Sequence, residues 1–470
     1  MTHRFTHETR VPQPREKVFA WHERPGALTR LTPPFGGGPD QVRQAPSDGI
    51  KPGSEARLGV SVPGTFGTVH LPWTAEHGEW EPPHFFTDRM VNGPLGEWEH
   101  RHVFEESPRG GTVVRDEVTV RPLPQWAGKL NDLGERAMTP QLERIFAYRD
   151  RQLREDLAFH DQHDGPRLTI AVAGSSGLVG TQVCALLETG GHTVLRMKRG
   201  ATTGEGVIGW DPARGLLNPR DLEGVDVVIH LGGQSIVSRF TEQKKREILD
   251  SRVDSTALIV RAMGQLPAEK RPRAFVVSSA VGYYGTGRGD EVLTEDSSSG
   301  EGFLAEVCRE WESAAHGAAA HGVRVVNVRT GLVLSPSGGL LRAQLPLMEA
   351  GLSGPLGGGR QWQSWIGLDD MAGAIAHLAL TEDAEGPFNV AAPNPQRQKD
   401  FAKTVAGVLH RPAVVPTPLA GPKALLGAQA TEELVAASHR VDVSKLLGTG
   451  YRFRHEDLRS CAAHLLGRTG

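Results

Sequence analysis

The sequence predicts an α/β fold: a doubly wound parallel sheet with a small C-terminal helical cap, preceded by an α+β unit. Two observations lead to this prediction. After residue 167, short apolar runs alternate with helical stretches, which is typical of β-α-β units whose sheet is covered on both faces. Before residue 160, alternating strand-like segments and turn residues dominate. We therefore expect three domains, at residues 1–160, 167–400 and 412–465, since 470 residues exceed one ordinary core.

Composition and charge narrow the class of protein. The formal charge of −3 does not suggest a nucleic-acid partner. The three cysteines lack a CxxC spacing, which argues against a disulfide framework and fits a reducing compartment, so we expect a cytoplasmic protein. No apolar run approaches the roughly 18 residues of a membrane helix, and the first residues lack the apolar core of a signal peptide. Neither a membrane span nor a leader is expected.

The first unit is expected to be an antiparallel sheet closed by a long helix. Residues 98–104 and 114–120 alternate as strands do, whereas 137–160 carry a helical apolar stripe. The segment 14–31 is expected to be a helix that breaks at Pro25-Gly26.

This order of elements resembles the START-like, polyketide cyclase-like helix-grip superfamily. The motifs that carry the resemblance are the VPxPxExVF start, the two prolines at 33–34 and the strand HRHVFEE. The resemblance implies a cavity for a hydrophobic ligand. The alternative is an α+β interaction domain.

Two histidines, His100 and His102, alternate on one expected strand. Two histidines at that spacing can bind a metal, but no third ligand is visible nearby in the sequence. We therefore expect no metal site, and we expect the pair to line a pocket or to face solvent.

A glycine-rich loop follows the first apolar run after the linker. The segment TIAVAGSSGLVG, residues 169–180, leads directly into an expected helix. In a Rossmann-like fold, the first glycine allows a tight turn, the second lets the backbone approach a pyrophosphate, and the third lets the helix pack on the strand. The expected cofactor-binding residues of this loop are Gly174, Ser175, Ser176, Gly177, Leu178, Val179 and Gly180.

The second strand of this unit bears on the choice of dinucleotide. It ends in Lys198 and Arg199, and no acid lies between Glu188 and Glu205. A carboxylate would hold a ribose 2′-hydroxyl, whereas a guanidinium pairs with a 2′-phosphate. The sequence therefore predicts NADP(H). The alternative is that both cations are ordinary surface charges.

Residues 168–465 resemble the extended short-chain dehydrogenase/reductase superfamily, and more closely its atypical epimerase-like branch with a C-terminal domain of unknown function. The carrying motifs are AGSSGLVG (173–180), WDP (210–212), VIHLGGQSI (228–236), SRVDST (251–256), SSAVGYYG (278–285), GFLAEVCREWE (302–312), VRTGLVLSPSGG (328–339), GPLGGGRQWQSWIGLDD (354–370) and FNVAAPNP (388–395). The resemblance implies an NADP(H)-dependent oxidoreductase or epimerase-like enzyme with a small-molecule substrate.

The proton-relay pair of that superfamily, Tyr-x-x-x-Lys, is absent from the sequence. Leu304 and Cys308 stand in its place. Hydride transfer to a carbonyl leaves an alkoxide that needs a proton donor. Ser278 or Ser279 fits the serine role, and the expected donors are Tyr283 and Tyr284, with Glu306 as a third candidate. Tyr284 also matches an ordinary structural tyrosine of the superfamily.

The resemblance assigns further residues to the cofactor and the substrate. The cofactor contacts that it implies are Leu231, Gly232, Glu247, Arg252 and Val333, with Asp211 either near the adenine or in a turn. A salt-bridged surface helix is the alternative for Glu247 and Arg252. Substrate residues are expected at Arg360, Gln361 and Trp365. The pair Asp369-Asp370 is expected to cap a helix.

Two alternatives to an enzyme remain open at the level of the sequence. The missing Tyr-Lys pair supports a sensor or regulator that binds NADP(H) without turnover. A carrier of a hydrophobic ligand, with a structural Rossmann module, is the other.

Overall fold

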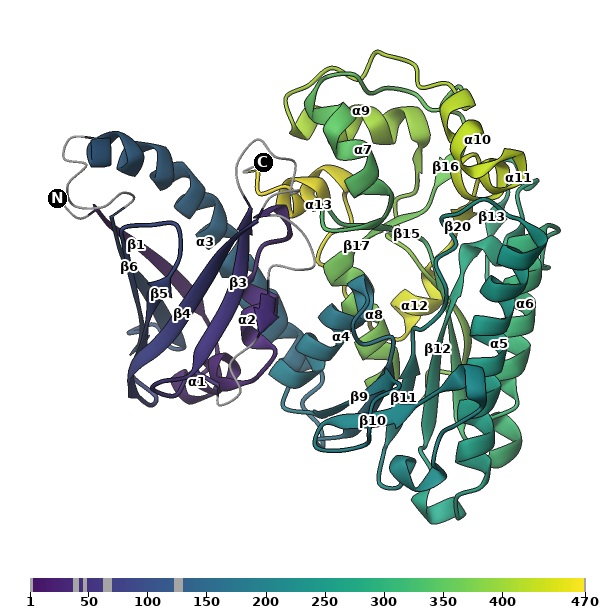
Figure 1. Ribbon diagram of the computed structural model, residues 1–470, viewed down its shortest axis with the longest axis horizontal. Coiled ribbons are helices and arrows are strands. Elements are labelled where there is room, and N and C mark those ends of the chain that lie inside the picture. Colours follow the sequence, from purple (N-terminus) through teal and green to yellow (C-terminus); the bar gives the residue numbers. More distant parts are fainter. Residues whose placement is uncertain (1–2, 37–41, 45–48, 62–69, 122–129, 469–470) are drawn as a thin grey trace.

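The computed structural model describes residues 3–36, 42–44, 49–61, 70–121 and 130–468. Two separate sheets divide the chain into an N-terminal lobe, residues 3–162, and a C-terminal lobe, residues 163–468, which lie side by side (Figure 1).

The N-terminal lobe contains one antiparallel sheet of seven strands in the order β1-β7-β6-β5-β4-β3-β2. Its strands are β1 (His3–Val11), β2 (Val42–Gln44), β3 (Glu55–Ser61), β4 (His70–Glu81), β5 (Phe85–Asn92), β6 (Glu97–Glu106) and β7 (Thr112–Arg121). The two expected strands lie within β6 and β7, so the prediction of an antiparallel sheet is confirmed.

The helices of this lobe include the break that the sequence predicted. The expected break at Pro25-Gly26 separates α1 (Arg15–Glu23) from α2 (Ala27–Leu31), and η1 (Pro34–Gly36) follows. The long helix α3 spans Leu130–Gln162 and is longer at both ends than the predicted 137–160. Its start was predicted too late because Gly134 and Pro140 both disfavour helix, and Pro140 lies inside it.

Helix α3 lies across one face of the antiparallel sheet (Figure 1). Leu142 and Phe146 pack against Val118 and Val120 of β7. Further along the helix, Leu153 and Leu157 join a core cluster with Phe104 of β6. Each such buried side chain contributes about 1.5–3 kcal/mol to the stability of the lobe.

The C-terminal lobe contains a parallel sheet of seven strands in the order β10-β9-β8-β11-β12-β14-β18. Its strands are β8 (Thr169–Ala173), β9 (Thr193–Arg199), β10 (Val207–Trp210), β11 (Val227–His230), β12 (Ala274–Ala280), β14 (Arg324–Thr330) and β18 (Gly386–Val390). The strand order reverses at β8, and ligands of such sheets bind outside the carboxyl ends of the strands at this point.

Helices cover both faces of the parallel sheet, as the apolar runs predicted. One face packs against α4 (Leu178–Thr189) and α8 (Leu368–Leu380). The other face packs against α5 (Glu242–Gly264) and α6 (Phe303–His316). The doubly wound parallel sheet is therefore confirmed.

The remaining elements are short and mostly lie in the last third of the chain. Helices α7, α9, α10 and α11 gather at one end of the C-terminal lobe (Figure 1). The short strands are β13 (Val292–Leu293), β15 (Leu332–Leu334), β16 (Trp362–Gln363), β17 (Trp365–Gly367), β19 (Gln396–Arg397) and β20 (Arg440–Val441). The α-helices are α7 (Gly339–Glu349), α9 (Gln398–Val408), α10 (Ala420–Leu426), α11 (Ala428–Ala430), α12 (Ser444–Gly448) and α13 (Leu458–Leu465). The short 3-10 helices are η3 (Pro212–Arg214), η4 (Pro219–Leu222), η5 (Ala268–Lys270), η6 (Val281–Tyr284) and η7 (Ala319–His321), and η8 (Thr431–Val435) is a π-helix.

A buried ionic network joins the two lobes. The guanidinium of Arg30 on α2 donates to both carboxylate oxygens of Asp156 on α3, each at 2.8 Å. It also lies 3.0 Å from Asp369 on α8 of the C-terminal lobe. Arg454 completes the network, with Nη2 2.7 Å from Asp156. Because Arg30 and Asp156 are fully buried, each charge depends on its partners for compensation.

The expectation that Asp369 and Asp370 cap a helix is wrong in detail. Helix α8 begins at Leu368 after Gly367, so both acids lie in its first turn, and both are buried. Asp369 pairs with Arg30, and Asp370 accepts hydrogen bonds from the backbone amides of Arg454 at 2.7 Å and His455 at 3.1 Å. Both carboxylates therefore interact with residues distant in sequence and not with the first amides of their own helix. The positive end of the helix dipole still stabilises their negative charge.

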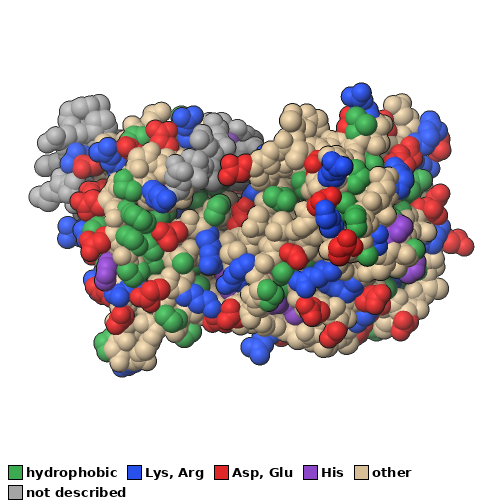
Figure 2. Space-filling view, turned by 90° about the horizontal axis from the view of Figure 1, so that it is seen from below, with side chains coloured by type: hydrophobic (Ala, Val, Ile, Leu, Met, Phe, Trp, Pro, Cys, Tyr) green, Lys and Arg blue, Asp and Glu red, His purple; other side chains and the backbone are tan. Residues whose placement is uncertain are grey.

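Charges of both signs are interspersed over the face of the molecule shown in Figure 2. Among the described residues, no helix has the length and the apolar character that crossing a membrane requires.

Candidate functional site

The glycine loop connects β8 to α4 and needs glycine at two positions. Gly174 has φ +82°, and a Cβ there would lie 2.8 Å from the carbonyl carbon of Leu231. A Cβ on Gly180 would lie 2.1 Å from the carbonyl oxygen of Gly174. The loop therefore lies against Leu231-Gly232 at the end of β11, and the helix lies against the loop.

The N-terminus of α4 is open to a ligand. Gly177 is its N-cap residue, and no side chain accepts from the first amides of the helix. Ser176 and Gly177 are exposed, whereas Ser175 is buried. Free amides at a helix N-terminus bind anions such as phosphate. The structure thus brings together the predicted loop residues in an arrangement that can hold a pyrophosphate.

Three predicted apolar contacts pack against one core cluster. Val179, Leu231 and Val333 are half-buried, and all three join that cluster. Val333 belongs to β15, which pairs with β17 rather than with the main sheet. Val179 lies in the first turn of α4 and Leu231 lies against Gly174, so these two can supply apolar surface beside the loop.

Lys198 and Arg199 end β9 and are exposed to solvent. Strand β9 lies next to β8, so its carboxyl end is adjacent to the glycine loop. In the part of the chain that the structure describes, neither cation forms an ion pair, whereas Arg196 on the same strand lies 2.6 Å from Glu188. The two side chains are thus free to bind an anion.

The two predicted residues of α5 differ in their surroundings. Glu247 is exposed and pairs with Lys244 at 3.1 Å, the arrangement of an ordinary surface helix. Arg252 is half-buried, and its guanidinium stacks over Trp311 at 5.0 Å. A Cβ on Gly233 would lie 2.8 Å from the guanidinium carbon of Arg252, so this cation lies against the loop after β11. Of the two, Arg252 is the one placed to contact a ligand.

Ser279 and Tyr284 both belong to a buried polar network. Ser279 donates to Glu312 at 2.7 Å, and Arg329 donates to both oxygens of Glu312 at 2.9 Å. The hydroxyl of Tyr284 donates to Asn389 at 2.7 Å and accepts from Arg329 at 3.1 Å. Burial raises the pKa of Tyr284 above its usual value. This tyrosine is therefore held in the structural role that its motif also allowed.

Tyr283 is placed differently from its neighbour. It is half-buried, and the guanidinium of Arg329 lies 3.5 Å from the centre of its ring. No hydrogen bond of its hydroxyl occurs within the described residues. Ser278 is also half-buried, and Glu306 is exposed on α6. Tyr283 is thus the candidate donor whose hydroxyl is not already used by the fold.

The positions of the missing Tyr-Lys pair are packed with apolar groups. Leu304 and Cys308 are buried on α6, and Leu304 joins a core cluster with Ile248 of α5. The thiol of Cys308 lies 3.7 Å from the carbonyl oxygen of Ala280, at the end of the serine strand. Burial raises the pKa of Cys308 to about 11, so this thiol stays protonated near neutral pH.

The remaining predicted contacts have local partners. Asp211 accepts from the amide of Arg214 and caps a turn, so the structural interpretation holds. Trp365 is fully buried and donates to the carbonyl of Asn394, so its side chain does not line a cleft. Gln361 donates to the carbonyl of Leu356, and Arg360 is exposed. Trp365 was misjudged because a tryptophan beside a glycine-rich loop gives no sign of which face is buried.

Arg329 and Asn389 were not found by sequence reasoning. They lie on β14 and β18, two neighbouring buried strands, in register with each other. The signal that could have found them was a polar residue inside an otherwise apolar strand. Such a residue is buried only when it has hydrogen-bonding partners, so it indicates a buried polar network.

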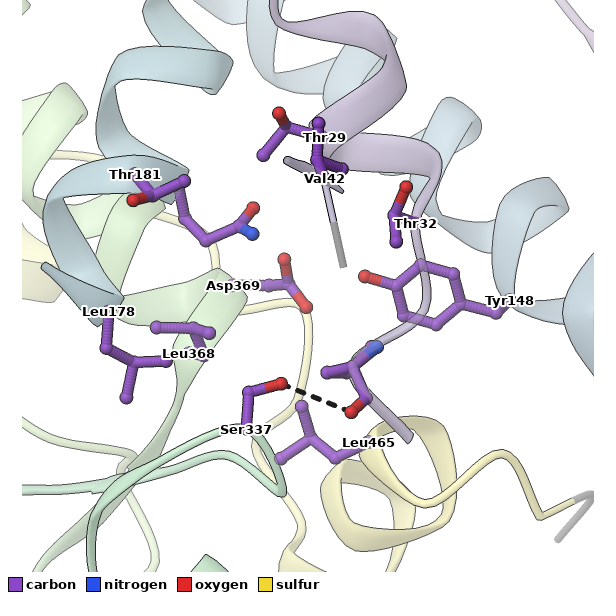
Figure 3. Close-up of a pocket in the computed structure, with 12 residues that line it drawn as sticks. Thr29, Thr32, Val42, Tyr148, Leu178, Thr181, Ser337, Leu368, Asp369 and Leu465 are labelled. Carbon is purple, nitrogen blue, oxygen red and sulfur yellow. Dashed lines mark hydrogen bonds between the residues drawn. The ribbon is translucent and has the colours of Figure 1, made fainter. Parts of the chain in front are cut away.

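A small cavity of about 90 Å³ lies where the two lobes meet (Figure 3). Leu178 and Thr181 of α4, at the start of the glycine-loop helix, line one side of it. Tyr148 of α3 lies on the opposite side, and Asp369 lies between them (Figure 3). The N-terminal lobe therefore borders the helix that carries the candidate cofactor loop.

These features define a class: a protein with a Rossmann-type parallel sheet whose glycine loop and helix N-terminus form a dinucleotide-type site. Comparison with known families agrees. The model of the NAD dependent epimerase/dehydratase family matches residues 170–391, and the domain of unknown function DUF1731 matches residues 417–465. The chain belongs to this epimerase family.

Relatives cover the C-terminal lobe almost completely. An epimerase family protein of Mycobacterium bovis is 36% identical over 302 residues, which is 64% of this chain and 98% of that protein. The human epimerase family protein SDR39U1, in a crystal structure with NADPH, is 30% identical with a TM-score of 0.57, over 64% of this chain and 99% of that one.

One solved structure extends over both lobes. The nucleoside-diphosphate sugar epimerase from Corynebacterium glutamicum is 34% identical, with a TM-score of 0.78, over 98% of this chain and 90% of that chain. The two-lobe arrangement is therefore shared with that protein.

Proposed function

We propose that this chain is an NADP(H)-dependent oxidoreductase or epimerase-like enzyme that acts on a small molecule. The observation that carries the proposal is the site at the end of β8. Gly174 and Gly180 leave no room for a Cβ, the amides of α4 are open, and two exposed cations end the neighbouring strand. The NADPH bound to human SDR39U1 supports the same choice of dinucleotide.

Calorimetric titration with NADPH and NADH tests the cofactor. We expect NADPH to bind more tightly, because Lys198 and Arg199 pair with the 2′-phosphate. A hydrogen bond to a charged group contributes about 1.5–3 kcal/mol, which is roughly ten- to hundredfold in affinity. Arg199→Asp should erase that preference. Arg109→Asp, an exposed site in a turn of the N-terminal lobe, is the matched control and should leave it unchanged. Equal affinities for the two cofactors in the unmodified chain would contradict the proposal.

For the chemistry, we propose Tyr283 as the proton donor, with Ser278 orienting the substrate, because the hydroxyl of Ser279 already donates to Glu312. The support is that the Tyr284 hydroxyl already has partners in the fold, whereas that of Tyr283 has none within the described residues. Tyr283→Phe should abolish turnover and preserve NADPH binding, because the proton is needed only in the transition state. Tyr284→Phe should mainly lower stability, since the buried Oδ1 of Asn389 then loses the hydroxyl that donates to it.

A panel of carbonyl compounds and nucleoside-diphosphate sugars, followed by NADPH absorbance and product analysis, is the activity assay. The second class is included because the two-lobe relative is described as acting on it. If Tyr283→Phe turns over at the unmodified rate, Tyr283 is not the donor.

A second candidate function is a sensor that binds NADP(H) without turnover. The observation that favours it is the apolar packing of Leu304 and Cys308, where the superfamily carries its proton relay. The two candidates separate in the same assay, because a sensor binds NADPH tightly and oxidises it with no member of the panel.

We further propose that the N-terminal lobe is a START-like domain that holds a hydrophobic ligand. A cavity of about 150 Å³ between the sheet and α2 supports this. Apolar side chains line most of it, among them Leu28, Leu31, Ile50, Leu58 and Trp73. Displacement of an environment-sensitive dye by fatty acids or aromatic compounds measures such binding.

We also propose a cytoplasmic location for this protein. The three cysteines are all free and buried, which fits the reducing cytoplasm.

A further inference from the structure

Four ionisable side chains cluster on neighbouring strands of the N-terminal sheet. Asp88 of β5 lies directly opposite His100 of β6, and His102 of β6 lies directly opposite Asp116 of β7. Both histidines are buried, and their ring centres are 3.8 Å apart. The structure therefore places a third candidate ligand, Asp88, beside the two histidines. The sequence hid the third group because only the antiparallel register of β5 and β6 shows that Asp88 faces His100.

The distances around Asp88 are those of ligands that share a metal ion. Its Oδ2 lies 3.5 Å from Nδ1 of His100 and 3.5 Å from Nε2 of His102, and neither contact is a hydrogen bond in the structure. All three ligand atoms lie within 4.8 Å of one another. Tetrahedral bonds of about 2.0–2.2 Å to nitrogen and oxygen place neighbouring ligands about 3.4 Å apart.

Asp116 occupies the position of a group that orients metal ligands. Its Oδ1 lies 3.0 Å from Nε2 of His100 and 2.7 Å from Nδ1 of His102, the ring nitrogens that do not face Asp88. A ligating histidine commonly donates its other N–H to a carboxylate, which fixes the ring and its tautomer. In the structure Asp116 makes such a hydrogen bond with His100, whereas its close approach to Nδ1 of His102 is not a hydrogen bond.

The cluster also opens onto the cavity of the N-terminal lobe. Asp88, His100 and His102 line that cavity, and Asp116 is not among its lining residues. An ion held by the first three would therefore face the cavity and keep a free coordination position there.

We propose that Asp88, His100 and His102 bind one divalent transition-metal ion at the wall of this cavity, with Asp116 as a positioning residue. Imidazole and carboxylate ligands suit Zn²⁺ and neighbouring metals. The free coordination position would accept a polar group of a ligand whose apolar part fills the cavity. This site is independent of the dinucleotide site in the other lobe.

Zinc titration of the full chain tests the proposal. The protein is prepared without an affinity tag, stripped with a chelator, and titrated calorimetrically with Zn²⁺. We expect one ion per chain, and we expect bound Co²⁺ to give the intense visible bands of a four- or five-coordinate site. His102→Ala and the isosteric Asp88→Asn should each weaken binding at least a hundredfold. Asp116→Asn should weaken it about 10- to 100-fold, the usual effect of removing such a partner.

The matched control is His316→Ala, which removes an exposed histidine at the end of α6 in the other lobe and should not change the affinity. Circular dichroism shows whether each variant keeps the fold. Absence of stoichiometric zinc binding to the unmodified chain would overturn the proposal. So would binding that persists unchanged in folded Asp88→Asn, or a Co²⁺ spectrum with only the weak bands of an octahedral hydrated ion.

Discussion

Removing Arg30 should destabilise the protein more than removing any surface cation, because Arg30 compensates two buried carboxylates at once. Its side chain is fully buried, donates twice to Asp156 at 2.8 Å and lies 3.0 Å from Asp369. In Arg30→Met, Asp156 keeps Arg454, whereas Asp369 loses its arginine and keeps only the amide of Gln152 at 3.1 Å and the ring of His464 at 3.4 Å. Breaking a buried pair in this way costs about 3–5 kcal/mol.

A second substitution separates the charge effect from lost packing. In the double variant Arg30→Met, Asp369→Asn, the remaining Arg454–Asp156 pair is neutral overall. We expect the double variant to be at least about 1 kcal/mol more stable than Arg30→Met alone, since residues of one network do not act additively.

Urea denaturation measures the free energy of unfolding of these variants. Lys245→Met is the control, because its pair with the exposed Glu242 contributes about 0–1 kcal/mol. If Arg30→Met costs no more than this control, the network does not couple the lobes. If the double variant costs the sum of the two single variants, uncompensated charge is not the cause.

Three other predictions follow from specific contacts. Gly180→Ala should abolish measurable NADPH binding in calorimetry, since its Cβ would lie 2.1 Å from a carbonyl oxygen. Retained affinity would mean that NADPH does not bind at this loop. Burial lowers the pKa of His230 to about 3, so only the unfolded chain takes up its proton as the pH falls below about 6.5. Stability should fall with acidification by up to about 1.4 kcal/mol per pH unit for this residue, and His230→Gln should flatten the measured curve. Limited proteolysis should cut at the exposed Asp164-Gly165. The two fragments should still co-elute in gel filtration, because the buried ion pair of Arg30 and Asp369 joins the two lobes. Separation of the fragments would contradict this prediction.

The sequence alone determined the layers of the fold and the place of the glycine loop. Apolar runs separated by helical stretches predict a parallel sheet covered on both faces, because a strand buried on both sides needs apolar residues at every position. The glycines at 174 and 180 were equally visible in the motif, although only the close contact of Gly180 with Gly174 is local, since Gly174 lies against Leu231 of another strand end. Local patterns of this kind can be recognised without knowledge of distant contacts.

Which polar residues act together was decided by the tertiary structure. Tyr283 and Tyr284 are adjacent in sequence, yet only Tyr284 is engaged by Asn389 of a distant strand. Asp88 and Asp116 join His100 and His102 only through the register of three antiparallel strands. The physical reason is that carboxylates, rings and hydroxyls find partners through space, and the spacing of residues along the chain carries no record of the strand pairing that brings them within a few ångströms.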